Sequence, residues 1–470
     1  MRCAHSKLIL SLFLLVSPSV FSEELTEIDF LAEEPIQISS VTRLNQEREN
    51  IPASISIIDR EMIEASSAIN VIELLRLVPG FIVGSIDGTE STTTYHGLSS
   101  QHNERLQIII DGRSVYQSTF GGALWYSLPI TLDEIEKIEV IRGPNAASYG
   151  ANAFSGTINI TTMKSDAGNK NEFSILAGDR DTQRARFSHA DGNEDLSYRV
   201  IAQVEENTGY QDTYENFEKD GKAKPLYDDH FHRQLSFRID KNGSDGALHT
   251  FQAGMKDLKF GGGWFNYDAN APFDKKVTSH FQNYTYFKAD GLFKTRRFQI
   301  YHNYVDYNAT LFNAPSHPSN LFTLDWSFRD QRVDMEFQEN QIWSPDLQTV
   351  WGLGYRYELS DSIGWLAEDH HSRNSYRVFG HLEYNLTESL ILNAGGFAED
   401  HEDIGNYVSP RLALNYRINN QHTLRTSLSR AYRMPSFYAQ YADQTIKSFY
   451  LPDMGFDFPQ ALGDSSLNPE

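Results

Sequence analysis

The sequence has 470 residues, enough for two or more domains, and carries 63 acidic against 41 basic side chains, a formal net charge of −22. Such an acidic excess disfavours nucleic acid as a partner, because a nucleic-acid-binding face must be basic. Beyond the first twenty-two residues there is no long apolar run, which excludes a helical membrane protein. A membrane β-barrel is still allowed, because its alternating strands average to a hydrophilic composition.

Residues 1–22 have the three parts of a secretory signal peptide. Arg2 and Lys7 give the positive start, Leu8–Val16 the apolar segment, and smaller residues surround a cleavage site before Glu23. The apolar segment is too short to cross a membrane as a helix. Cys3 is the one cysteine and would leave with this segment. We therefore expect a mature chain without disulfides or thiolate metal sites.

Residues 50–165 predict a small α+β domain that can bury a core of its own. Asp59 is a good N-cap for a helix over Arg60–Ala65, and Ala68–Val78 has a helical apolar stripe that Pro79-Gly80 ends. The expected strands are Ser54–Ile58, Phe81–Val83, Leu106–Ile110, Lys137–Ile141 and Thr157–Thr162. Two loops, Gly84–Ser100 and Gly112–Leu128, separate them.

The segment Ile138–Thr162 organises this domain. Two β-branched strands are joined by Gly143-Pro144, a short helix-compatible piece at Asn145–Tyr149, and two further glycines. A phosphate-binding loop would need a Gly-Lys-Ser/Thr ending or a GxGxxG spacing, and neither is present. The residues favour a strand, a tight buried elbow and a returning strand.

From Asp166 onward the helical stripes stop and period-two alternation takes over. Thirteen strands are predicted: Glu172–Gly178, Thr182–His189, Leu196–Val204, Phe231–Ile239, Leu248–Met255, His280–Phe287, Arg297–Val305, Phe328–Ile342, Thr349–Tyr357, Tyr376–Tyr384, Ser389–Phe397, Pro410–Ile418 and His422–Ala431. Their connections alternate between short turns and long polar links such as Glu205–His230 and Ala398–Ser409. Such alternation is typical of an outer-membrane barrel, with short periplasmic turns and long outer loops.

Four motifs resemble the plug domain of TonB-dependent outer-membrane receptors, in that family's order. They are Ile51–Ser54, Leu74–Phe81, Leu106–Tyr116 and the elbow from Ile141-Arg142-Gly143-Pro144 to Gly156–Ile160. Three later stretches resemble the family's barrel: Ser409–Leu414, Ser429–Ser436 and Leu467–Glu470. The resemblance implies a 22-stranded antiparallel membrane β-barrel with an N-terminal α+β plug. Since thirteen strands are found and closed barrels of bacteria are even-numbered, we expect a truncated receptor.

The resemblance divides the chain into a signal peptide (1–22), a periplasmic segment (23–49), a plug (50–165) and an incomplete barrel (166–470). It implies a receptor in the outer membrane, in contact with lipid and lipopolysaccharide, that imports a scarce solute with energy from the TonB complex. A ferric siderophore is the favoured ligand, with cobalamin as the alternative. A passive porin or adhesin would lack the plug motifs. No catalytic arrangement stands out, so we expect neither an enzyme nor a cofactor.

The family's periplasmic segment carries a TonB box, a short stretch that adds a strand to TonB. This needs extended propensity without a fixed fold. The β-prone island Pro35, Ile36, Gln37, Ile38, Ser39, Ser40 and Val41 is our candidate, with Leu25–Phe30 as a rival position. The alternative is that the island is an ordinary tail leading into the first plug strand.

The two plug loops are the family's ligand-facing apices, and both carry aromatic residues. Exposed aromatic rings between glycines can clamp a planar ligand, although they can equally pack against the barrel wall. The ligand-binding candidates in the loops and in one long barrel link are Tyr95, Tyr116, Gln117, Phe120, Trp125, Tyr126, Trp264 and Phe265.

The elbow is expected to hold the plug in the barrel, because the family pairs a plug arginine there with barrel carboxylates. The residues concerned are Arg142, Gly143, Pro144, Tyr149 and Gly150. We expect no metal site. Asp369–His371 and Asp400–Asp403 have suitable residue types but are better read as solvated loop charge. A haem receptor would need a histidine between Pro435 and Asn468, and there is none.

Overall fold

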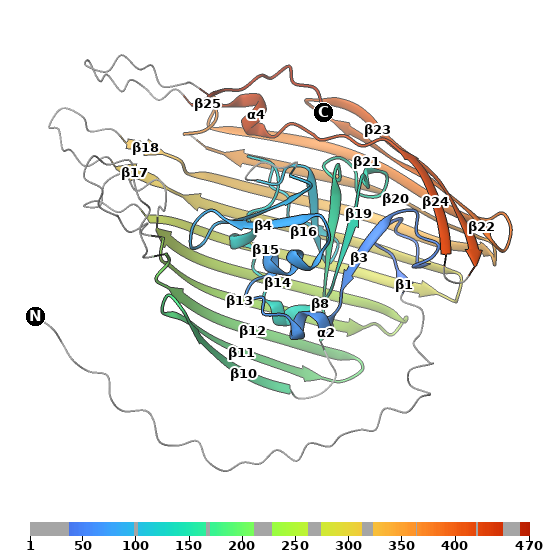
Figure 1. Cartoon of the computed structure of the whole chain (residues 1–470), viewed down its shortest axis with the longest axis horizontal. Coiled ribbons are helices and arrows are strands. Elements are labelled where there is room, and N and C mark those ends of the chain that lie inside the picture. Colours follow the sequence, from blue (N-terminus) through green and yellow to red (C-terminus); the bar gives the residue numbers. More distant parts are fainter. Residues whose placement is uncertain are drawn as a thin grey trace, which may run out of the picture.

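The computed structural model describes residues 37–97, 102–165, 170–210, 228–261, 274–312, 323–362, 364–419, 422–444 and 461–470. A small N-terminal domain lies in the hollow of one large curved sheet (Figure 1). Of the helices in these ranges, none is long and apolar enough to cross a membrane.

The small domain, which we call the plug, is built on a five-stranded sheet in the order β3-β8-β9-β6-β7. Strands β6 and β9 are parallel and the other neighbours antiparallel. The plug elements are β3 (Ser54–Ile58), α2 (Arg60–Ala65), η1 (Val71–Leu77), β4 (Phe81–Ser85), β5 (Ser91–Tyr95), β6 (Leu106–Ile110), β7 (Arg113–Ser114), η2 (Trp125–Ser127), η3 (Leu132–Glu134), β8 (Ile135–Arg142), α3 (Ala146–Tyr149) and β9 (Gly156–Thr162).

The plug has a core of its own between this sheet and the helical segments α2 and η1. Leu74, Ile108, Val140 and Ile158 are fully buried in it, together with most of the apolar positions that the sequence pattern marks. Each such side chain contributes roughly 1.5–3 kcal/mol by leaving water. The sheet can therefore present its edges and loops to the barrel without losing its shape.

Two plug elements differ from the sequence expectation. The stripe expected to be an α-helix over Ala68–Val78 is a shorter 3₁₀ helix, η1, which begins after Asn70. Its Asn70 makes no side-chain cap, so the first turn lacks the hydrogen bond that Asp59 gives α2. The loop expected at Gly84–Ser100 contains strand β5, which pairs with β4, because the run Thr92–Thr94 is β-branched.

The large sheet has thirteen antiparallel strands, each paired with the next along the chain, and β10 and β24 form its edges. Its strands are β10 (Lys170–Gly178), β11 (Thr182–Gly192), β12 (Leu196–Asn207), β13 (His230–Asn242), β14 (Ala247–Gly261), β15 (Asp274–Asp290), β16 (Lys294–Asn308), β19 (Phe328–Ser344), β20 (Leu347–Asp361), β21 (His370–Asn385), β22 (Leu390–His401), β23 (Gly405–Asn419) and β24 (His422–Ser429).

All thirteen predicted strands are present in this sheet. Most are longer than predicted, chiefly at the ends that carry the long links. Polar residues continue the strand pairing at these ends. One link is misjudged: Ala398–Ser409 is not a long loop, since β22 continues to His401 and β23 begins at Gly405. Short pairs complete the described structure: β1 (Gln37–Ile38) with β2 (Gln46–Glu47), β17 (Thr310–Phe312) with β18 (Thr323–Asp325), and β25 (Asp443–Gln444) with β26 (Ala461–Leu462).

The two faces of the large sheet are opposite in character to those of a soluble protein. The outward face exposes apolar side chains, for example Leu353, Val378 and Leu428. The inward face buries charged ones, such as Arg332 and Arg377. A polar lumen with an apolar outer surface is the pattern of a membrane barrel wall. The plug lies in that lumen, and plug and wall meet through polar contacts and through two small apolar clusters.

Candidate functional site

A cavity of about 590 Å³ separates the plug from the wall formed by β10–β14. On the plug side it is bordered by η1, the β4–β5 turn and the segment Trp125–Asp133. Its charged lining is mostly cationic: Arg76, Arg180, Arg184, Arg186 and Lys256 against Glu73, Asp133 and Glu205. This is notable in a chain whose net charge is −22.

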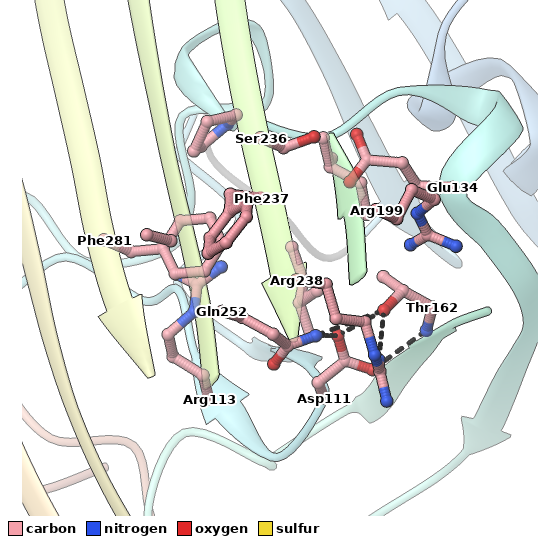
Figure 2. A pocket seen from close by; sticks show the side chains of 14 residues that line it. Asp111, Arg113, Glu134, Thr162, Arg199, Ser236, Phe237, Arg238, Gln252 and Phe281 are labelled. Atoms are coloured by element: carbon pink, nitrogen blue, oxygen red, sulfur yellow. Dashed lines mark hydrogen bonds between the residues drawn. The ribbon is translucent and has the colours of Figure 1, made fainter. Parts of the chain in front are cut away.

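A second, much smaller pocket lies where the turn of the β6–β7 hairpin meets β13 and β14 (Figure 2). Asp111 accepts hydrogen bonds from the Thr162 amide and hydroxyl at 2.9 and 2.7 Å and from Gln252 of the wall at 2.7 Å. Arg238 donates to the Thr162 hydroxyl at 3.1 Å. These hydrogen bonds cross the pocket and join the plug to the wall.

The Asp111-Gly112 pair makes this junction possible. Both residues have positive φ, 51° and 82°, as a two-residue hairpin between β6 and β7 requires. A Cβ on Gly112 would lie 2.3 Å from an Arg297 nitrogen of the wall. Glycine therefore serves both the turn and the close approach of the two domains. Burial lowers the pKa of neighbouring Arg113 to about 10.

Arg43 is the most connected residue of the N-terminal segment. It donates to the Ser148 carbonyl at 2.6 Å, pairs with Glu336 of β19 at 2.5 Å, and lies 4.0 Å above the Phe379 ring. Glu336 also pairs with Arg377, which pairs with Asp334. The segment that leads into the plug is therefore tied into a buried ionic network of the barrel wall.

The elbow is held against the wall by β21, β22 and β23. Arg411 donates to the Pro144 carbonyl and to the Asn145 side chain, both at 2.7 Å. The Ala151 amide donates to Glu399 at 2.7 Å. Gly150 has φ +75°, and a Cβ there would lie 2.7 Å from the same carboxylate.

Within the elbow, Tyr149 is partly buried, and desolvation of its hydroxyl raises its pKa to about 12. Gly143 has φ +97°, which a turn into Pro144 requires here. The expected ion pair of Arg142 is absent: its side chain pairs with no described carboxylate, and its Nε is buried without a described hydrogen-bond partner. Arg43 and Arg411 make the plug–wall contacts instead.

The second plug loop is fastened to the wall by one carboxylate. Asp330 of β19 accepts four hydrogen bonds through one oxygen, from the amide and hydroxyl of Ser118 and of Thr119, at 2.8–2.9 Å. The backbone amides of Phe437 and Tyr438, in α4 (Phe437–Tyr441), donate to the carbonyls of Ser118 and Thr119. Asp330 was not among the predicted site residues, because one aspartate in an alternating strand carries no distinct signal.

The aromatic residues of this loop pack inward, so the exposed arrangement expected for a clamp is not found. Trp125 belongs to the plug core, and Tyr116 is 6% exposed. Phe120 packs edge-on against Phe328 of the wall and Trp365 of the β20–β21 connection. The alternative interpretation, packing against the barrel wall, describes this loop better, because it closes on itself through the bond from the Gln117 amide to the Gly122 carbonyl.

Of the remaining ligand candidates, Tyr126 packs on Phe260. Both Tyr126 and Trp125 line the large cavity. Burial raises the pKa of both Tyr116 and Tyr126. Gln117 is buried, and Tyr95 packs on Phe81. Trp264 and Phe265 lie outside the described residues.

The described part of the proposed TonB box is folded, contrary to the expectation of a segment without fixed structure. Gln37 and Ile38 form β1, and Ile38 and Val41 pack fully buried against Ile51 and Ile141. Ser40 is buried and Ser39 exposed. Pro35, Ile36 and the rival Leu25–Phe30 lie outside the described residues. The apolar residues of the β-prone island pack into this buried cluster.

The two stretches with metal-ligand residue types, Asp369–His371 and Asp400–Asp403, make other contacts. His371 stacks on Tyr441 with ring centroids 4.1 Å apart, and Asp403 pairs with Arg373 at 2.8 Å. A different group, Glu205, His230 and His232, brings three possible ligand atoms within 4.8 Å of one another on the cavity wall. Spacing in the sequence gave no hint of it, since Glu205 comes from a neighbouring strand.

Comparisons with known proteins place this architecture. Residues 47–157 match the model of the TonB-dependent receptor plug domain, and residues 178–470 match the model of the TonB-dependent receptor-like β-barrel. A plug of this topology inside a wall of this pattern, matched along most of the chain, defines the class. The chain belongs to the TonB-dependent receptor family.

Among curated proteins, the vitamin B12 transporter of Photobacterium profundum is 26% identical over 431 residues, 89% of this chain and 64% of that protein. The iron-regulated outer membrane virulence protein of Vibrio cholerae is 31% identical over 188 residues, 38% of this chain and 28% of that protein. The chain thus spans less than two thirds of the length of these relatives.

Among solved structures, a mutant ferric enterobactin receptor of Pseudomonas aeruginosa in complex with enterobactin superposes with a TM-score of 0.71 at 16% identity, covering 89% of this chain and 68% of that one. At this identity the likeness concerns the fold.

Proposed function

We propose that the chain acts in an outer-membrane receptor that binds a ferric siderophore and imports it with energy from TonB. The observation that carries the choice of ligand is the cationic lining of the large cavity, five basic against three acidic side chains. Ferric complexes of catecholate siderophores are anionic, so a positive field raises both their local concentration and their rate of entry.

The composition of the rest of the chain strengthens this argument. In a protein with an excess of acidic residues, a basic lining is unlike the average surface. Trp125 and Tyr126 lie on the same cavity wall and offer apolar surface beside the cations. Apolar walls with a few charged groups are the usual make-up of a small-molecule site.

The outward face of the wall supports the proposed location. Its exposed apolar side chains suit a lipid or lipopolysaccharide environment. The strand ends that carry the long connections lie at one end of the sheet, together with α4, and we assign this end to the cell surface. The short turns and the start of β3 then face the periplasm, where TonB acts.

Cobalamin is the second candidate, because the vitamin B12 transporter of Photobacterium profundum aligns with 89% of this chain. The two ligands differ in charge: cyanocobalamin is neutral overall and gains little from a basic cavity. Charge-removing variants can therefore separate the two proposals.

The test is a binding and uptake assay in cells that express the receptor, with ferric enterobactin and cyanocobalamin as probes. The double variant Arg76→Gln/Arg180→Gln should weaken ferric enterobactin binding about tenfold, equivalent to roughly 1.4 kcal/mol, with a reduced dependence on salt. Arg233→Gln is the matched control, because Arg233 is 70% exposed in its side chain and does not line the cavity. Specific binding of cyanocobalamin alone, unaffected by either change, would overturn the siderophore proposal.

A further inference from the structure

Glu205, His230 and His232 converge near the long-connection ends of β12 and β13. Glu205 and His232 are directly opposite each other in the antiparallel register, and His230 lies two residues away on the same face. Glu205 is 3.1 Å from His230 Nε2 through one oxygen and 3.9 Å from His232 Nε2 through the other. All three side chains line the large cavity. The strand register thus brings one carboxylate and two imidazoles to a single point.

Two imidazoles and one carboxylate are the donor set that zinc and related divalent metals take in sites with an open position. In a tetrahedral zinc site with nitrogen ligands, donor atoms lie about 3.3 Å apart. The three donor atoms here already lie within 4.8 Å of one another. Small side-chain rotations on two rigid neighbouring strands would bring them to a bound ion.

The surroundings contain both an unsatisfied polar atom and a competing cation. The donor atom of His230 is Nε2, which faces Glu205, and the other ring nitrogen, Nδ1, is buried without a hydrogen-bond partner in the described part of the chain. Arg184 holds one oxygen of Glu205 at 2.5 Å and is itself fixed by the Ile69 carbonyl at 2.9 Å. The other oxygen, which faces His230, is therefore oriented rather than blocked. His232 would exchange its 3.2 Å contact with Gln203 for the metal.

The basic neighbours decide what else the ion must bind. Arg184 and Lys256 both face Glu205, which is the one carboxylate of the donor set. A divalent ion among these charges is left with a net positive site. Its remaining position, directed into the cavity, therefore favours water or an anionic oxygen donor.

We propose that Glu205, His230 and His232 form a binding site for one divalent transition-metal ion of the zinc type, with an open coordination position that faces the cavity. This goes beyond siderophore uptake and does not depend on it, because metal binding can be measured on the purified chain without any transport. It also departs from the expectation, drawn from the sequence, that the chain holds no metal.

The experiment uses the full chain without a histidine tag, purified in detergent and loaded with Zn²⁺, or with Co²⁺ as a spectroscopic probe. We expect one Zn²⁺ per chain to remain after desalting, and Co²⁺ to give visible absorption bands of nitrogen-bound cobalt. Glu205→Gln and His232→Gln preserve side-chain volume and should each weaken Zn²⁺ binding at least tenfold. His249→Gln is the matched control, since His249 bonds Tyr284 on a neighbouring strand.

Folding of each variant is checked by circular dichroism and by heat-modifiable gel mobility. If a variant fails to fold, the wild-type Co²⁺ spectrum still decides, because nitrogen ligation by histidine is visible in it. Retention of Zn²⁺ by His232→Gln at the wild-type level would overturn the proposal. So would a folded wild-type chain that binds neither Zn²⁺ nor Co²⁺.

Discussion

Replacing Asp330 with alanine should release the second plug loop from the barrel wall. The change removes the acceptor of four donors on Ser118 and Thr119, in a place where all three side chains are buried. Of these donors, the Thr119 hydroxyl keeps its contact with the Ser360 hydroxyl. Hydrogen bonds to a charged group contribute about 1.5–3 kcal/mol each. They are not additive, because one oxygen accepts all four.

A buried donor left without an acceptor costs about 1–3 kcal/mol, so we take about 3–5 kcal/mol for the loop as a whole. This corresponds to an increase of roughly a hundred- to several-thousandfold in the local opening equilibrium. The two backbone bonds from α4 to the loop remain and set the upper limit. Asp330→Asn keeps one acceptor oxygen and should show a smaller effect, about tenfold.

Hydrogen exchange of the Ser118 and Thr119 amides, followed by mass spectrometry of the peptide that contains them, measures this opening. Asp257→Ala is the control, because Asp257 pairs with Arg233 on the exposed face, where an ion pair contributes less than about 1 kcal/mol. Unchanged protection of the loop in a folded Asp330→Ala chain would refute the assignment of this carboxylate as its anchor.

Three further predictions concern the plug and its contacts. Arg43→Met should destabilise the N-terminal segment by about 3 kcal/mol, the lower end for a buried pair because Glu336 keeps Arg377. The readout is faster hydrogen exchange at β2, and the control is Arg60→Met, because the partly exposed Arg60 pairs with Glu64 on its own helix. Gly150→Ala should cost about 1–3 kcal/mol in backbone strain plus the clash with Glu399, seen as a lower urea midpoint. Burial raises the pKa of Glu134, so its contribution to stability is greatest below the unfolded pKa and falls as pH rises through the raised value. Glu134→Gln should flatten that fall when urea unfolding is followed upward from about pH 4; an unchanged pH profile would contradict it.

The sequence allowed the fold to be predicted well because the fold rests on periodic patterns. Alternation along each strand reports which face is apolar, and every strand of the wall carried it. The ends of the strands were less predictable. At the strand ends that carry the long links, the buried side chains are polar, so a prediction based on apolar residues ends the strand too early. His230 and Lys256 lie in such extensions.

Most of the residues that join plug and wall could not be predicted, for a different reason. Asp330, Glu399 and Arg411 are single polar residues on alternating strands, and their importance arises from what the plug places opposite them. The elbow was recognised because glycine and proline punctuate it. Arg43 carries no such mark, although it makes the ion pair that was expected of Arg142.

The buried position of Ile38 leads to a test of where TonB engages the chain. If residues 35–41 are the TonB box, β1 must leave β2 and the apolar cluster around Ile51 before it can add to another sheet. A proline at Ile38 would both block strand addition and disrupt this packing, so its effect would be ambiguous. A reversible lock avoids the ambiguity.

Ile38 and Gln46 are direct partners in the β1–β2 pair, and Cys3 is the one native cysteine. In the variant Ile38→Cys/Gln46→Cys, a disulfide would hold β1 in place in the oxidising periplasm. We expect uptake of ferric enterobactin to stop in the oxidised cells and to return after mild reduction, while surface binding stays the same throughout. The single variant Gln46→Cys is the control for the substitution itself. Normal uptake with the disulfide fully formed would show that TonB pulls on a stretch before residue 35, and Leu25–Phe30 would then be the position to test.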